Sequence, residues 1–214
     1  MSSFGINGKI QSIIKNETGE IVNKIEEELI EWTQEITQFH FPRWEELPDF
    51  DLYMDQVLTL IDKYLFVFNP SKQKKIITAS MINNYVKLDL IPPPVKKRYK
   101  KKHLAYLIAI SVLKQVLTIP EVKEGLVYQA SISGIRGAYD LFCTEQEAAL
   151  VAIGSHLEKK EPSPLPLLPN DTDMNNLVVR TATIAVATKI VTEKTLALIG
   201  EEKVRNKKDG KSKK

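Results

Sequence analysis

The chain of 214 residues is 43% hydrophobic and 27% charged, which supplies enough apolar content for one sizeable core and excludes a largely disordered protein. Its one cysteine, Cys143, excludes an internal disulfide, and its longest apolar stretches are interrupted by Arg180 and Lys189, short of a membrane span. We see no apolar N-terminal leader, and therefore predict a cytoplasmic protein that does not bind membranes.

The N-terminal part shows two helical patterns. After a turn expected at Thr18 and Gly19, apolar residues follow the helical period while glutamates occupy the opposite face. The apolar positions of this first helix, which should end before Pro42, are Ile21, Ile25, Leu29, Trp32 and Ile36. Asp51 opens a second helix, closed at residues 69–71, whose core side consists of Leu52, Val57, Leu60, Ile61 and Leu65.

The segment 78–103, TASMINNYVKLDLIPPPVKKRYKKKH, is the most informative part of the sequence. With Thr78 as N-cap, a short helix places four residues on a core side: Met81, Ile82, Tyr85 and Leu88. The opposite side carries polar side chains of a length that suits base edges and phosphates in a major groove: Ser80, Asn83, Asn84 and Lys87. An ordinary solvated helix face is the alternative interpretation.

A proline-stiffened basic segment follows this helix. Pro92, Pro93 and Pro94 stop the helix and impose an extended path. Six cations then surround Tyr99, namely Lys96, Lys97, Arg98, Lys100, Lys101 and Lys102. We predict that this segment forms a basic β-hairpin wing, with a solvated loop as the alternative.

Charge is distributed unevenly along the chain. Residues 72–103 contain nine Lys and one Arg against a single acid, Asp89, whereas the whole chain has a net charge of only +3. The remainder is therefore net acidic, with glutamates gathered in the first helix at positions 26, 27, 28, 31 and 35. Such polarity orients a protein on a polyanion and predicts salt-dependent binding to nucleic acid.

The next segments are also helical in pattern. A very apolar helix is predicted at 103–117, and Thr118 and Thr144 each begin a capping-box spacing that should start a further helix. Glycines at positions 125, 134 and 137 interrupt the region between them. Residues 131–136 therefore form either a turn or a poorly propagating helix.

The C-terminal part divides into a Pro-rich linker at 161–171, a helix at 172–200 and a basic tail at 201–214 with too few apolar residues to be ordered. The helix carries a heptad series, Leu177, Ile184, Val191 and Leu198. It either folds back on the helical domain of residues 1–160 or forms a homodimer, and the sequence leaves both open.

Motifs for catalysis are missing from the sequence. It has no phosphate-binding glycine loop, dinucleotide fingerprint or zinc-protease motif. His40, His103 and His156 stand far apart and lack ligands at metal-binding spacing, so we predict neither a metal nor a cofactor. Cys143 has no local partner that would activate it, and we expect a buried thiol in a protein that is not an enzyme.

Two resemblances rest on these residues. The runs WEELPDFDLYMDQVLTLIDKYL and ITASMINNYVKLDLIPPPVKKRYKKKHLAYLIAISVLKQVLTIPEV resemble a bacterial domain of unknown function, family number 1836, over about residues 44–126. More distantly, residues 81–91 and the basic segment after them are similar to the recognition helix and wing of MerR-like winged helix-turn-helix regulators. In that comparison Tyr85 matches an aromatic position and Lys87 a basic position near the DNA backbone.

The second resemblance extends into the basic segment but has departures. Lys97 and Tyr99 match the Arg-x-Tyr of the regulators, and His103 stands where an aspartate usually begins the next helix. Asn83 replaces an arginine, which would change any base preference. Asp89 replaces the glycine that follows the recognition helix, and Asp tolerates a left-handed backbone less well than Gly.

The resemblance implies an all-α, mainly helical fold with a small β-hairpin wing, in which a winged helix-turn-helix at about 51–126 lies inside a helical bundle. It implies a sequence-specific transcription regulator that binds double-stranded DNA. The expected DNA contacts are Ser80, Asn83, Asn84, Lys87, Lys96, Lys97, Arg98, Tyr99, Lys100 and Lys101. The alternative is a non-catalytic interaction module that binds an acidic protein or RNA through the same basic surface.

Overall fold

The structure is a computed structural model that describes residues 4–70, 75–158 and 173–212. Over these residues the chain is mainly helical, which confirms the predicted all-α class. The predicted Pro-rich linker at 161–171 lies outside the described residues. Within the described ranges, no helix combines the length and the apolar content that crossing a membrane requires.

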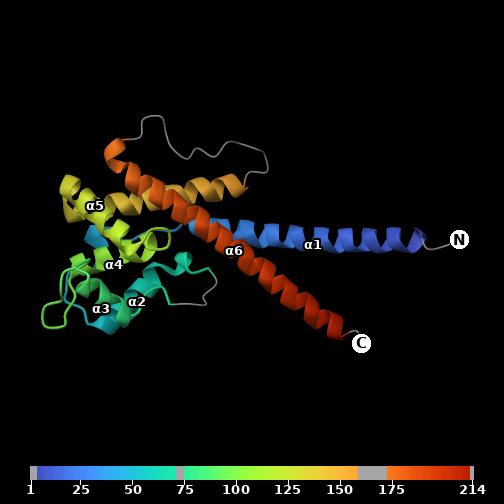
Figure 1. Cartoon of the computed structure of the whole chain (residues 1–214), viewed down its shortest axis with the longest axis horizontal. Coiled ribbons are helices and arrows are strands. Elements are labelled where there is room, and N and C mark those ends of the chain that lie inside the picture. Colours follow the sequence, from blue (N-terminus) through green and yellow to red (C-terminus); the bar gives the residue numbers. More distant parts are fainter. Residues whose placement is uncertain (1–3, 71–74, 159–172, 213–214) are drawn as a thin grey trace.

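The helices form two groups (Figure 1). Three long helices pack on one another and make up the larger part of the molecule: α1 (Phe4–Thr37), α5 (Ile119–Glu158) and α6 (Leu177–Ser212). Three shorter helices gather at one end: α2 (Met54–Tyr64), α3 (Ala79–Lys87) and α4 (Lys101–Leu113). Short 3-10 turns occur at Trp44–Glu46, Phe66–Phe68 and Met174–Asn176.

The core is centred on α4, the most apolar of the short helices. This helix contacts α2, α5 and α6, and its side chains are buried along most of its length. The largest fully buried side chains among them are Leu104, Leu107, Ile108 and Ile110. Because burying each such side chain contributes about 1.5–3 kcal/mol, α4 joins the short-helix group to the long helices as one folded unit.

The helix α1 is continuous, and the turn predicted at Thr18 and Gly19 is wrong. A single glycine inside a helix costs about 1 kcal/mol relative to alanine, which is too little to end it. Near its C-terminus α1 approaches α5 so closely that a Cβ on Gly154 would lie 2.3 Å from Cγ2 of Thr37. A larger residue at position 154 would therefore force the Thr37 side chain to move.

The helix α5 is bent at Gly134, whose backbone angles are φ 70° and ψ 170°. This conformation is accessible to glycine and strained for other residues, and it resolves the ambiguity at 131–136 as a kink between two helical halves. The helix start predicted at Thr118 is confirmed by a hydrogen bond of 2.7 Å from the Thr118 N–H to Glu121 Oε2. The start predicted at Thr144 is wrong, since Thr144 lies inside α5 and its hydroxyl donates to the Asp140 carbonyl.

The helix α6 packs against α5 and α1 of its own chain. Buried polar contacts fix its register on α5, because Gln146 Nε2 donates to the Thr183 carbonyl at 3.1 Å and Arg180 pairs with Glu145 at 2.8 Å. The helix continues to Ser212, past the predicted end at residue 200. The sequence analysis expected disorder from residue 201 onward, whereas the structure has helix there, with an ion pair of 3.0 Å between Arg205 and Glu28 of α1.

The predicted β-hairpin wing is also wrong, since the described residues contain no strand. The segment instead makes two isolated bridges, Val95 with Arg98 and Leu52 with Tyr99. Lys96 and Lys97 have φ angles of 51° and 61°, the left-handed pair that a tight two-residue turn needs. The three prolines before this turn lack the N–H groups that a longer ladder would use.

Candidate nucleic-acid interface

The helix α3 is fixed at its N-terminus and along one side. Thr78 acts as N-cap, as predicted, because its hydroxyl oxygen accepts a hydrogen bond of 3.3 Å from the Met81 N–H. Ile82 and Tyr85 are buried against the core. The fourth predicted core residue, Leu88, is 47% exposed. Its prediction is wrong because α3 ends at Lys87 and the helical period no longer applies.

The chain reverses direction directly after α3. Asp89 has a φ of 53°, so it occupies the left-handed conformation that the sequence comparison assigned to this position. The N–H of Leu90 then bonds to the Tyr85 carbonyl at 2.9 Å, which satisfies a carbonyl at the end of the helix. Leu90 and Ile91 are buried and replace Leu88 in anchoring this end.

The opposite side of α3 faces solvent. Ser80, Asn83, Asn84 and Lys87 are all exposed, and with Met81 and Tyr85 they line one shallow depression. The helical spacing therefore brings these four predicted contact residues together on one face. A helix of this width, presenting amide and ammonium groups from a rigid backbone, has the dimensions and the donors that fit a major groove.

Residues 95–100 form a tight turn, called the basic turn below, which holds most of the predicted cations at the surface. Lys96 and Lys97 are exposed at its tip, and Lys100 is exposed where α4 begins. Arg98 is half-buried, with its guanidinium 3.8 Å from the centre of the Tyr53 ring. Lys101 is also half-buried and lies 4.0 Å from the Glu45 carboxylate, so part of its charge is already compensated.

Tyr99 differs from the other predicted contacts. Its side chain is only 3% exposed and its ring packs edge-on against His103, so the ring is not accessible from the surface. Its backbone exchanges two hydrogen bonds of 2.8 Å with Leu52, at the entrance to α2. Tyr99 therefore holds the turn in place and does not belong to the exposed contact surface.

His103 fixes the start of α4 beneath the turn. Its Nδ1 accepts a hydrogen bond of 2.8 Å from the Lys100 N–H, so the neutral ring acts as a cap. Burial lowers the pKa of His103, and the neighbouring charge of Lys102 lowers it further. The histidine therefore belongs to the scaffold of the surface and carries no charge near neutral pH.

Three residues that the sequence did not single out position this surface. Lys114, the residue directly after α4, donates from Nζ to the Ile76 carbonyl at 2.9 Å, holding the segment before α3, and burial lowers its pKa. Lys123 of α5 donates to the Leu88 carbonyl at 3.1 Å, behind the end of α3. Tyr53 supports Arg98. All three act through contacts distant in sequence, and no local pattern signals them.

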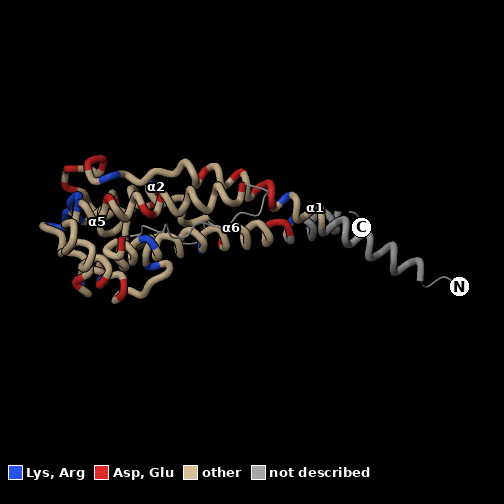
Figure 2. Tube along the Cα trace, turned by 90° about the horizontal axis from the view of Figure 1, so that it is seen from above, with Lys and Arg blue, Asp and Glu red and all other residues tan. Residues whose placement is uncertain are grey.

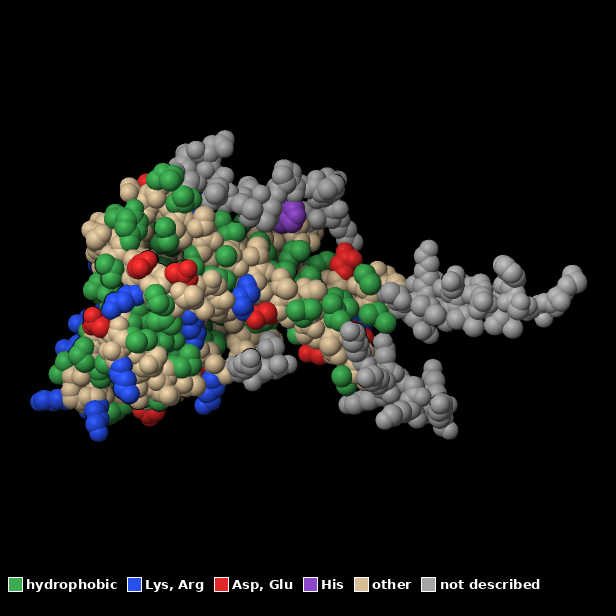
Figure 3. Space-filling model, viewed as in Figure 1, with side chains coloured by type: hydrophobic (Ala, Val, Ile, Leu, Met, Phe, Trp, Pro, Cys, Tyr) green, Lys and Arg blue, Asp and Glu red, His purple; other side chains and the backbone are tan. Residues whose placement is uncertain are grey.

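The cations protrude together at the end of the molecule that holds the short helices (Figure 3). Acidic residues, in contrast, are spaced along α1 in the long-helix part (Figure 2). The described part of the chain contains no cluster of three His, Cys, Asp or Glu side chains suited to a metal ion. Cys143 is a buried free thiol, and burial raises its pKa to about 12.

The connection between α2 and α3 spans residues 65–78, of which 71–74 lie outside the described residues. Helix-turn-helix units use a turn of about 3–4 residues at this place. The two helices nevertheless contact one another. The two helices therefore pack together, but the connection between them is much longer than the turn of a helix-turn-helix unit.

Of three comparisons with known proteins, one gives a match, and this match lies in the short-helix end and the first part of α5. Neither the curated proteins nor the solved structures contain a significant match to this chain. One family model does match, over residues 42–142, which include α2, α3, α4 and the kink of α5. The resemblance to family number 1836 seen in the sequence is thereby confirmed: this segment is similar to the family described as Domain of unknown function (DUF1836).

Proposed function

We propose that this protein is a sequence-specific transcription regulator that binds double-stranded DNA through α3 and the basic turn. The observation that carries this proposal is the juxtaposition at one end of the molecule. Ser80, Asn83 and Asn84 form an exposed polar helix face, and the exposed lysines of residues 96–102 lie on the same short-helix group. Base contacts supply specificity and phosphate contacts supply register, and this surface has groups for both.

In this proposal α3 enters the major groove. Asparagine pairs bidentately with adenine through N6 and N7, so Asn83 and Asn84 are the base-reading residues, with Ser80 beside them. Lys87, at the end of the same face, contacts an adjacent phosphate. Each correct bidentate contact discriminates against the wrong base by about 1–3 kcal/mol.

The basic turn grips the backbone of the duplex. Lys96, Lys97 and Lys100 are exposed and contact phosphates, and Arg98 reaches them from its stacked position on Tyr53. Lys101 adds a weaker charge because Glu45 lies beside it. Each phosphate neutralised on B-DNA contributes a slope of about −0.9 in log K against log salt, so affinity should fall steeply as salt rises.

The MerR-like resemblance supports the same mode of binding, with one difference. The turn replaces the wing strands of those regulators, and it is anchored through Leu52 and Tyr99 rather than through a β-ladder. A homodimer would present two copies of α3 to two half-sites, as is common among regulators of this class. The target site of such a dimer would be an inverted repeat.

The test is selection of bound sequences from a random pool of duplex DNA at about 150 mM salt, where non-specific attraction is already weakened. We expect recovery of a defined motif by the wild-type chain and its loss by an Asn83→Ala, Asn84→Ala double variant that keeps every lysine. An inverted repeat in the motif would support the dimer. Absence of any enriched sequence from the folded wild type would refute sequence-specific binding.

A second candidate is an interaction module that binds an acidic protein or RNA. The exposed aromatic rings of Phe50 and Tyr53 beside the basic turn favour it, since exposed rings next to cations suit stacking with unpaired bases. Competition separates the two candidates. Release of bound duplex by an equal concentration of single-stranded RNA would favour the module, whereas preference for the selected duplex favours the regulator.

A further inference from the structure

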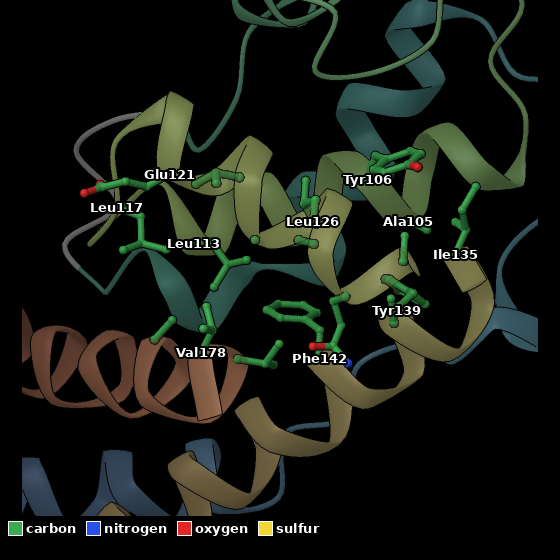
Figure 4. Close-up of a pocket in the computed structure, with 18 residues that line it drawn as sticks. Ala105, Tyr106, Leu113, Leu117, Glu121, Leu126, Ile135, Tyr139, Phe142 and Val178 are labelled. Carbon is green, nitrogen blue, oxygen red and sulfur yellow. The ribbon is translucent and has the colours of Figure 1, made fainter. Parts of the chain in front are cut away.

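An apolar pocket lies between α4, α5 and α6 (Figure 4). Side chains from both halves of the bent α5 reach it, and Leu113, Leu126, Tyr139, Phe142 and Val178 surround a common space. Its volume is about 50 Å³. The pocket is separate from the polar face of α3, and the inference drawn from it does not depend on DNA binding.

The pocket exists because small residues line its walls beside a bent helix. Five alanines and a glycine are among its lining residues: Ala105, Ala109, Ala130, Ala138, Ala182 and Gly125. The two halves of α5 meet at the kink at Gly134, so side chains from both halves contribute to the wall. Protein interiors are otherwise close-packed, so space of this kind inside a core costs stability.

One polar side chain opens on this space without a partner. Gln129 lines the pocket and is only 3% exposed. Its Nε2 lies 3.4 Å from Asn176 Oδ1, but its Oε1 has no hydrogen-bond partner among the described residues. A buried acceptor in that state is destabilising, and a donor brought into the pocket would satisfy it.

We propose that this pocket binds a small neutral molecule with an apolar body and one hydroxyl or N–H donor. The apolar body replaces the missing packing, and the donor bonds to Oε1 of Gln129. The ligand is neutral because the lining holds no cation, and the one carboxylate, Glu121, is exposed at the rim and already accepts from Thr118.

The size of the pocket limits the ligand. A dry cavity of about 150 Å³ admits benzene, and this pocket is smaller, so it holds only part of a single ring or a short alkyl chain. The rest lies against the apolar wall that the pocket shares with the adjoining groove, formed by Tyr106, Leu126, Ala130 and Ile135. Water is a poor occupant because it needs two to four polar partners and the lining offers one free acceptor.

The test uses the full-length chain and two probes of similar shape, phenol and toluene, with binding followed by ligand-observed NMR. Phenol should bind about five-fold more tightly than toluene, the effect of one net hydrogen bond. Gln129→Met keeps the side-chain length but removes the acceptor, and it should abolish this preference while toluene still binds.

Gly125→Ala supplies a second variant that leaves the fold intact. Its Cβ would lie 3.9 Å from Val178 Cγ1, an ordinary contact, and alanine favours the helix. Because the methyl group enters the pocket, both probes should bind at least several-fold more weakly. Absence of binding by either probe to the wild type, an unchanged preference in Gln129→Met, or unchanged affinities in Gly125→Ala would each overturn the proposal.

Discussion

The guanidinium of Arg98 lies 3.8 Å from the centre of the Tyr53 ring, which joins the basic turn to the residue before α2. The backbone bonds between Leu52 and Tyr99 lie next to this contact in both segments. The charged segment, predicted from the sequence as a β-hairpin wing, is instead a turn fixed to the helical core. Its lysines are therefore held at fixed positions on the surface and do not move freely with a flexible loop.

Removing this contact should loosen the turn. We expect Arg98→Ala to lower the free energy of unfolding by about 0.5–1 kcal/mol, the usual contribution of a cation–π pair at a partly exposed site. Lys97→Ala is the matched control in the same turn and should change stability by less than about 0.5 kcal/mol. Urea titration measures both variants, and equal losses would show that the stacked pair contributes nothing.

Base reading and phosphate binding should separate in DNA affinity. Asn83→Ala should cost about 1–3 kcal/mol on the preferred site and relax its sequence preference. Lys100→Ala should weaken all sequences alike and reduce the salt slope by about 1. Fluorescence anisotropy on the preferred and a scrambled duplex, at several salt concentrations, measures both quantities.

Two outcomes of these affinity measurements would contradict the prediction. If Asn83→Ala and Lys100→Ala lost affinity equally on both duplexes, α3 would not be the base-reading element. A loss confined to Lys100→Ala would leave a non-specific polyanion surface, as the second candidate function requires.

The bend of α5 should depend on glycine at one position. Gly134→Ala places a Cβ on a backbone with φ 70°, and we expect a loss of about 1–3 kcal/mol in the free energy of unfolding. Gly200→Ala, in α6 with nothing within 4 Å, should instead stabilise by about 0.5–1 kcal/mol. Opposite signs in denaturant unfolding would support the kink, whereas stabilisation by both variants would contradict it.

His103 should make stability depend on pH. Because its pKa is lowered in the folded chain, its contribution is fully present above its ordinary value of 6.5 and is lost as the pH falls toward the folded pKa. His103→Gln keeps an acceptor for the Lys100 N–H without titrating. The wild type should therefore lose more unfolding free energy than His103→Gln between pH 7.5 and pH 5.5, and equal losses would exclude this role.

Local signals predicted three features at the ends of elements correctly, although the helix start expected at Thr144 was wrong. The cap at Thr78, the helix start at Thr118 and the left-handed Asp89 each depend on side chains within a few residues of one another. The polar face of α3 follows from helical periodicity alone. These features needed no knowledge of distant contacts.

Distant contacts explain the errors. Tyr99 stands among lysines in the sequence, but its burial is decided by Leu52, far away in the chain. Residues 201–212 lack apolar content, yet Arg205 and Glu202 pair with residues of α1. The pocket around Gln129 was not predicted because its walls come from three helices that only the kink at Gly134 brings together.

The position of Phe142 inside α5 has a consequence for dissecting the molecule. The family match ends there, but the same helix continues to Glu158, and its later turns carry Leu150 and Ile153 against the terminal helices. A fragment limited to residues 42–142 would end within α5 and expose apolar surface that is buried in the whole chain. We therefore expect the smallest autonomous folding unit to be longer than the homologous segment and to include both terminal helices.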